Sequence, residues 1–256
     1  MTDIHEISGL GLAVETTGPI GIGPTIVMLH EGLGSITQWR DFPERIYAAT
    51  GLPVVAYDRS GYGRSEPGPA QYGADFMHRE ALEILPALLQ NFEISQPILL
   101  GHSDGASIAL IAAASDLVDP VGVITIAAHI FVEQAGLNGV RVAKDRRDQI
   151  VEGMARHHQQ PAIAFDRWST IWLDPSFETF DICEILGDIS CPLLVLQGDH
   201  DEYATEEMVH GITRRVPQAV GKFISQCGHI AHKDQPDVLV EEIVSFLSTQ
   251  GTSPIS

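Results

Sequence analysis

Residues 97–113 read PILLGHSDGASIALIAA, and this stretch decides the fold. The apolar run PILL predicts a buried strand, and the small-residue run that starts near Ala106 predicts a helix. Between them residues 101–105 form the pattern G-x-S-x-G, which in this context presents a serine on a sharp strand-to-helix turn. We therefore take Ser103 as the candidate nucleophile. Because the helix begins at once, the backbone amide of Asp104 is a candidate donor to an oxyanion.

Short apolar runs elsewhere in the chain alternate with longer stretches that have helical spacing. This alternation is typical of an α/β fold, in which helices cover both faces of a mostly parallel sheet. Further strands are expected at residues 25–30, 53–57, 122–127, 192–197 and 220–225. Helices are expected at residues 73–92 and 236–248. A site should form where the carboxyl ends of the strands meet.

One long segment, residues 133–188, interrupts the alternation and is a candidate helical lid. The core domain would then consist of residues 1–132 and 189–256. The lid holds four aromatic residues that could form either its own core or a wall of the substrate site. They are Phe165, Trp168, Trp172 and Phe177.

A serine hydroxyl needs a base to take its proton, and that base needs a carboxylate to orient it. His229 lies in a glycine-containing loop after the last expected strand, with His232 as a rival in the same loop. Asp199 and Asp201 both follow the strand at residues 192–197. Either one gives the chain order Ser, Asp, His that this architecture uses.

The loop after the first expected strand reads HEGLGS at residues 30–35, where glycines let the backbone approach a ligand. We choose the Gly32 amide as the second oxyanion donor, with Leu33 as the alternative. Cysteine chemistry has little support, because Cys227 shares the loop of His229 but is not on a sharp turn. The histidines lack the spacing of metal ligands, and the chain has no G-x-G-x-x-G motif or P-loop. We expect neither a metal nor a cofactor.

The composition excludes several classes of partner. The 256-residue chain carries 34 acidic against 15 basic residues, a formal net charge of −19, which should repel nucleic acid and anionic membranes. Its three cysteines suggest no disulfide framework, and its first residues do not resemble a signal peptide. The expectation is a cytoplasmic enzyme that acts on a small molecule, as a monomer or small homo-oligomer.

Five blocks carry a resemblance to a known superfamily. They are LHEGLGS at residues 29–35, YDRSGYGRS at 57–65, GHSDGA at 101–106, QGDHDEYAT at 197–205 and CGHIAHKDQP at 227–236. The chain resembles the α/β-hydrolase superfamily, specifically small lidded bacterial serine hydrolases of the esterase and meta-cleavage-product-hydrolase type. The resemblance implies an eight-stranded, mostly parallel sheet with a helical lid inserted before the last two strands. It also implies Asp201 as the triad acid and His229 as the base.

The resemblance implies a function as well. The expected activity is hydrolysis of a carboxylic ester or thioester of a small apolar or aromatic substrate, through an acyl-enzyme on Ser103. The alternatives are hydrolysis of a C–C bond in a 1,3-dicarbonyl or ring-cleavage product, a triad-dependent lyase reaction, and a non-enzymatic binding protein. One departure stands out, because Glu31 replaces the usual glycine after His30. The expected substrate-contacting residues are Glu31, Leu33, His102, Trp168 and Trp172.

Overall fold

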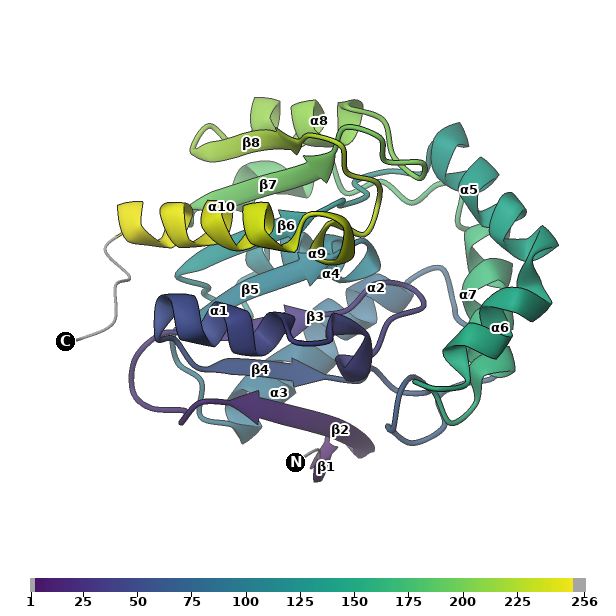
Figure 1. The fold of residues 1–256 in the computed structure, drawn as a ribbon, viewed down its shortest axis with the longest axis horizontal. Coiled ribbons are helices and arrows are strands. Elements are labelled where there is room, and N and C mark those ends of the chain that lie inside the picture. Colours follow the sequence, from purple (N-terminus) through teal and green to yellow (C-terminus); the bar gives the residue numbers. More distant parts are fainter. Residues whose placement is uncertain (1–2, 251–256) are drawn as a thin grey trace.

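A computed structural model describes residues 3–250, and it contains one eight-stranded sheet (Figure 1). The strand order is β1-β2-β4-β3-β5-β6-β7-β8. The strands are β1 (Asp3–Ile7), β2 (Leu10–Thr17), β3 (Thr25–Leu29), β4 (Val54–Tyr57), β5 (Pro97–His102), β6 (Gly122–Ile126), β7 (Leu193–Gly198) and β8 (Ala219–Ile224). Strand β2 pairs antiparallel with β1 and β4, and every other pair is parallel. The predicted mostly parallel, eight-stranded α/β fold is confirmed.

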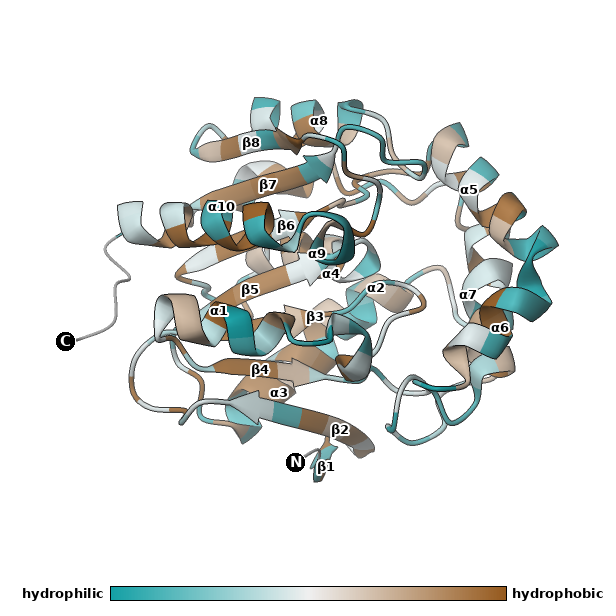
Figure 2. Ribbon diagram, in the orientation of Figure 1, coloured by the Kyte–Doolittle hydropathy of each residue, from teal (hydrophilic) through white to brown (hydrophobic). Residues whose placement is uncertain are grey.

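The central strands are buried on both faces, as their continuous apolar runs predict. Every residue of β3 to β7 is buried. Side chains alternate between the faces: Val27 and Leu29 join the apolar cluster around α4, whereas Ile26 and Met28 join the cluster beneath α1 and α10. In Figure 2 the apolar colour accordingly follows the strands.

Helices cover both faces of the sheet and its carboxyl edge. They are α1 (Phe42–Thr50), α2 (Phe76–Arg79), α3 (Leu85–Asn91), α4 (Asp104–Ala113), α5 (Gln134–Asp145), α6 (Arg147–Met154), α7 (Pro161–Trp172), α8 (Glu207–Arg215), α9 (Ala231–Asp234) and α10 (Pro236–Thr249). Two short 3₁₀ turns, η1 (Ile36–Trp39) and η3 (Ile185–Asp188), complete the set together with the π-helical turn η2 (Glu80–Ile84).

The helix predicted at residues 73–92 begins three residues later than expected and is not uniform. It runs from α2 through the wider η2 turn into α3. The wide turn comes just before Pro86, which has no amide hydrogen to donate to the preceding turn.

Helices α5 to α7 lie between β6 and β7 in the chain, so the insertion precedes the last two strands. They lie beside the carboxyl ends of the central strands (Figure 1). Two buried side chains attach them to the core. Arg167 donates hydrogen bonds to the carbonyls of Gly61 and Pro69, and His158 contacts the Gly63 amide and the Leu33 carbonyl.

Candidate active site

The sharp turn after β5 holds Ser103 in a strained conformation, with φ 53° and ψ −119°. A positive φ is costly for a residue with a side chain and persists only where the surroundings enforce it. Gly101 and Gly105 must lack side chains, because a Cβ on either would collide with backbone carbonyl groups. Packing of α4 against β3 and β5 therefore forces Ser103 outward, into a cavity.

The loop after β7 brings Asp201 to the ring of His229, which lies in the loop after β8. Asp201 Oδ1 is 2.8 Å from His229 Nδ1, and both side chains are buried. Burial alone would lower the pKa of His229, but the charge and hydrogen bond of Asp201 outweigh it and raise the pKa above its ordinary value. The same contact lowers the pKa of Asp201 despite its burial. Asp201 thus fixes the tautomer of His229 that leaves Nε2 free to act as a base.

The two rival residues lie elsewhere. Asp199 accepts a hydrogen bond from the Cys227 amide and is near His200, which is the environment of a loop-stabilising aspartate. His232 is buried against Trp39, and neither of its ring nitrogens has a hydrogen-bond partner in residues 3–250. Burial lowers its pKa to about 3. Neither rival lines the cavity that holds Ser103.

Backbone amides suited to an oxyanion flank the same cavity. Within residues 3–250 the amides of Gly32, Leu33 and Asp104 donate no hydrogen bond to another protein group. The Asp104 amide is at the start of α4, where the helix dipole adds positive potential. A side chain at Gly32 would collide with the indole of Trp168, so glycine is what lets α7 pack directly on this loop.

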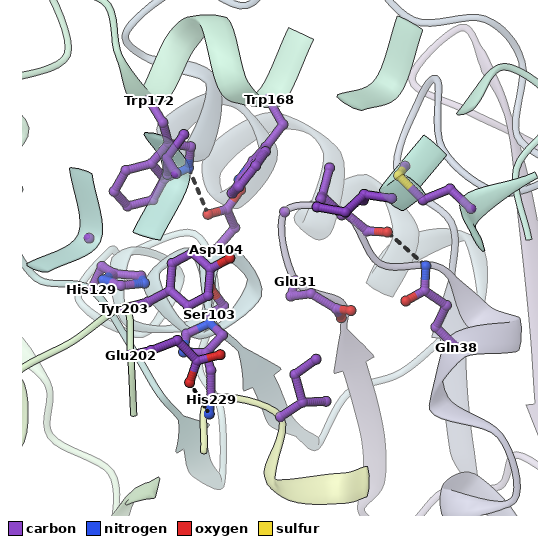
Figure 3. A pocket seen from close by; sticks show the side chains of 17 residues that line it. Glu31, Gln38, Ser103, Asp104, His129, Trp168, Trp172, Glu202, Tyr203 and His229 are labelled. Carbon is purple, nitrogen blue, oxygen red and sulfur yellow. Dashed lines mark hydrogen bonds between the residues drawn. The ribbon is translucent and has the colours of Figure 1, made fainter. Parts of the chain in front are cut away.

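The cavity has a volume of about 240 Å³ and is lined by residues of α5 to α7 and of loops that follow the strands. Figure 3 shows the two tryptophans, Tyr203 and His129 around Asp104, with Ser103 and His229 below them. The lining residues are Glu31, Gly32, Leu33, Gln38, Ser103, Asp104, His129, Gly136, Val140, Ile150, Met154, Trp168, Trp172, Glu202, Tyr203, His229 and Ile230. A site of this size suits a small substrate.

Four of the five expected substrate contacts line the cavity: Glu31, Leu33, Trp168 and Trp172. His102 does not. It ends β5, where successive side chains point to opposite faces, so its ring lies beneath the cavity against Trp39 rather than in it. Of the four aromatic residues singled out between residues 133 and 188, only Trp168 and Trp172 line the cavity. Phe165 and Phe177 are fully buried in the core.

Several lining residues were not predicted. His129 follows β6 and has its pKa lowered to about 3, chiefly by burial, so it presents a neutral ring. Tyr203 and Glu202 adjoin Asp201, and Gln38 lies on η1. The strand-end rule that found the other site residues also applies to His129, and the block QGDHDEYAT contains Glu202 and Tyr203.

The cavity wall is acidic. Glu31, Asp104 and Glu202 line it, and its described lining includes no lysine or arginine. Asp104 accepts a hydrogen bond from the Trp172 indole at 3.2 Å, and Arg59 lies 3.9 Å behind its other oxygen. Burial raises the pKa of Asp104, and Arg59 only partly offsets that effect.

Among residues 3–250 no group of three or more His, Cys, Asp or Glu side chains is arranged to hold a metal ion. Over the same residues, no helix combines the length and apolar character needed to cross a bilayer.

The sequence pattern of the alpha/beta hydrolase family matches residues 26–242. The chain belongs to the α/β hydrolase family. This α/β hydrolase is 23% identical to the sn-1-specific diacylglycerol lipase ABHD11 of Mus musculus, over 88% of this chain and 81% of the relative. It is also 22% identical to the 2-succinyl-6-hydroxy-2,4-cyclohexadiene-1-carboxylate synthase of Salmonella agona. That match covers 88% of this chain and 94% of the synthase.

A bacterial membrane phospholipase A described as a virulence factor has the same fold in its crystal structure, with a TM-score of 0.82. Its sequence is 17% identical, and the match covers 98% of this α/β hydrolase and 86% of the phospholipase chain. Hydrolase activity is the coarse assignment that family membership supports. The bond cleaved is a separate question, because relatives on one fold differ in substrate.

Proposed function

We propose that this α/β hydrolase is a serine hydrolase that cleaves carboxylic esters or thioesters of small apolar or aromatic substrates. The observation that carries the proposal is the combination, at one cavity, of a strained Ser103 with the hydrogen-bonded pair of His229 and Asp201. A serine on such a turn with an oriented imidazole beside it has the parts that acyl transfer requires.

In the proposed reaction His229 Nε2 takes the proton of Ser103 as its Oγ attacks the substrate carbonyl carbon. The amides of Gly32 and Asp104 stabilise the negative charge that develops on the carbonyl oxygen. His229 then gives the proton to the leaving alcohol or thiol, and the acyl group remains on Ser103. Water activated by the same histidine releases the acid and restores the hydroxyl.

The proposed substrate class follows from the walls of the cavity. Aliphatic side chains of α5 and α6, namely Val140, Ile150 and Met154, line the cavity together with the indoles of Trp168 and Trp172 on α7. Such walls favour apolar or aromatic groups, and the volume of about 240 Å³ favours short ones.

The test is hydrolysis of a p-nitrophenyl ester series from acetate to decanoate. We expect turnover with an optimum at short acyl chains, and its loss in Ser103→Ala. Ser115→Ala is the matched control, because Ser115 lies just past the far end of α4, away from the cavity, and its hydroxyl bonds only the Ala112 carbonyl and the Leu117 amide. Ester turnover that survives Ser103→Ala would rule out the proposed nucleophile.

C–C bond cleavage or a lyase reaction is the second candidate, since the similarity to the carboxylate synthase extends over most of both chains. A substrate with several carboxylates would meet Glu31, Asp104 and Glu202, with no basic side chain in the described cavity lining to pair with it. The acidic wall therefore favours the ester reading. If no ester is hydrolysed, product analysis with a neutral 1,3-diketone tests C–C cleavage at the same serine.

A further inference from the structure

A second acid–histidine pair lies under the candidate site, formed by Glu31 and His102. Glu31 stands in the loop after β3, and Gly34 leaves room for its carboxylate. Its Oε2 is 3.4 Å from His102 Nδ1. Burial alone would raise the pKa of Glu31, but the contact with His102 lowers it well below its ordinary value. Glu31 is therefore an ionised carboxylate that faces the histidine.

His102 is completely buried, and both of its ring nitrogens face oxygen atoms. Nε2 is 2.9 Å from the carbonyl oxygen of His229. Because a carbonyl only accepts, Nε2 must carry a hydrogen. Nδ1 lies at ion-pair distance from the Glu31 carboxylate, and it forms no hydrogen bond within residues 3–250.

This pair connects the three segments that the proposed chemistry needs. Glu31 belongs to the oxyanion loop, His102 directly precedes Ser103, and the acceptor is the main chain of His229. Asp201 fixes the rotation of the His229 ring. The main chain of His229 is held separately: its amide donates to Glu202 Oε2 at 3.2 Å, and its carbonyl accepts from His102 Nε2. Small displacements of a catalytic group cost much of its rate, so the backbone needs its own anchor.

We propose that Glu31 and His102 act together as a positioning pair: the Glu31 carboxylate orients the His102 ring, and the His102 Nε2–H holds the His229 main chain against the serine turn. The proposal rests on the proposed function, in which His229 is the base. The proposal also explains why glutamate replaces the usual glycine at position 31, since a glycine there could not orient His102.

The test compares kcat and KM for the best p-nitrophenyl ester with the rate at which a fluorophosphonate labels Ser103. His102→Leu should lower kcat and the labelling rate by about tenfold or more, with KM within about twofold. His102→Gln keeps an N–H donor and should restore most of the loss. Glu31→Gln should lower kcat by less, again without a change in KM.

The double variant Glu31→Gln/His102→Leu separates a pair from two independent residues. If Glu31 acts through His102, the double variant is no slower than His102→Leu alone. His232→Leu is the matched control, because His232 is buried beside His102 without a hydrogen bond to His229 and should keep its rate. Thermal midpoints show which variants remain folded, and Glu31→Gln serves as the mild variant if His102→Leu does not fold.

Additive losses in the double variant would overturn the proposal, as would a loss confined to KM, which would make Glu31 a substrate contact. The labelling rate keeps this result separate from the proposed function. If wild type hydrolyses no ester but the phosphonate still labels Ser103, the positioning pair is tested by labelling alone.

Discussion

Asp199 and Asp201 lie two residues apart on the loop after β7, but only Asp201 reaches the ring of His229. The side chain of Asp201 is 1% exposed and that of Asp199 is 35% exposed. A charge–charge interaction is strong where water is excluded and weak where it is not, so the buried aspartate is the one that shifts the histidine. Sequence order allows both residues to be the acid, and only the path of the loop distinguishes them.

Asp201→Asn should therefore change both the rate and its pH dependence. Activity requires neutral His229, whose pKa Asp201 raises, so the acid limb of kcat/KM in wild type should lie above about pH 6.5. With asparagine the limb should move to lower pH, and kcat should fall about 10³- to 10⁴-fold. Asp199→Asn is the control and should keep both. An unchanged acid limb in Asp201→Asn would contradict the assignment, and pH–rate profiles of the three proteins decide it.

At the scale of elements, a buried arginine fastens α5 to α7, the segment predicted to be a lid, to the core. Arg167 on α7 donates to the carbonyls of Gly61 and Pro69 at 3.0 Å each, and its guanidinium lies over the rings of Tyr62 and Tyr72. Carbonyls in such a position are costly to leave without a donor. The segment after β4 thus holds helix α7 against the core.

Arg167→Met should cost about 2 kcal/mol or more of unfolding free energy, because the stem still packs but the carbonyls lose their donor. Arg147→Met is the matched control, since Arg147 is on the exposed side of the lid and pairs there with Asp166. That pair is open to solvent, so its removal should leave stability nearly unchanged. Urea denaturation measures both variants, and equal stabilities would contradict the account of the lid.

The elements differ in how well sequence predicts them. All six strands expected from the sequence form, with ends within one residue. Five of them, β3 to β7, are buried on both faces and therefore need a continuous apolar run, whereas β8 is largely exposed. Strands β1 and β2 were not identified from their own residues. They lie at one edge of the sheet, where DIHEI and LGLAVETT include exposed polar residues. Helices α1 and α8 were missed too, although both bury an apolar side against the sheet.

At the scale of the molecule, the sheet gathers residues from distant parts of the chain at one edge. Ser103, Asp201 and His229 each follow a strand, so their convergence could be expected from the sequence. The walls of the cavity could not be predicted from the sequence, because they depend on how α5 to α7 lie over the strand ends. The spacing of apolar residues in the sequence does not determine how these helices are placed over the strand ends. It also could not show that the ring of His102 points beneath the cavity.

The most direct test of the central claim is to trap the acyl-enzyme. After rapid mixing with a short-chain p-nitrophenyl ester and an acid quench, mass spectrometry of the digested protein should find the acyl group on Ser103. The adduct should form in Asp199→Asn as in wild type, and no adduct should form in Ser103→Ala. Ester turnover with the acyl group on another residue, or with no adduct at any time during turnover, would contradict the account.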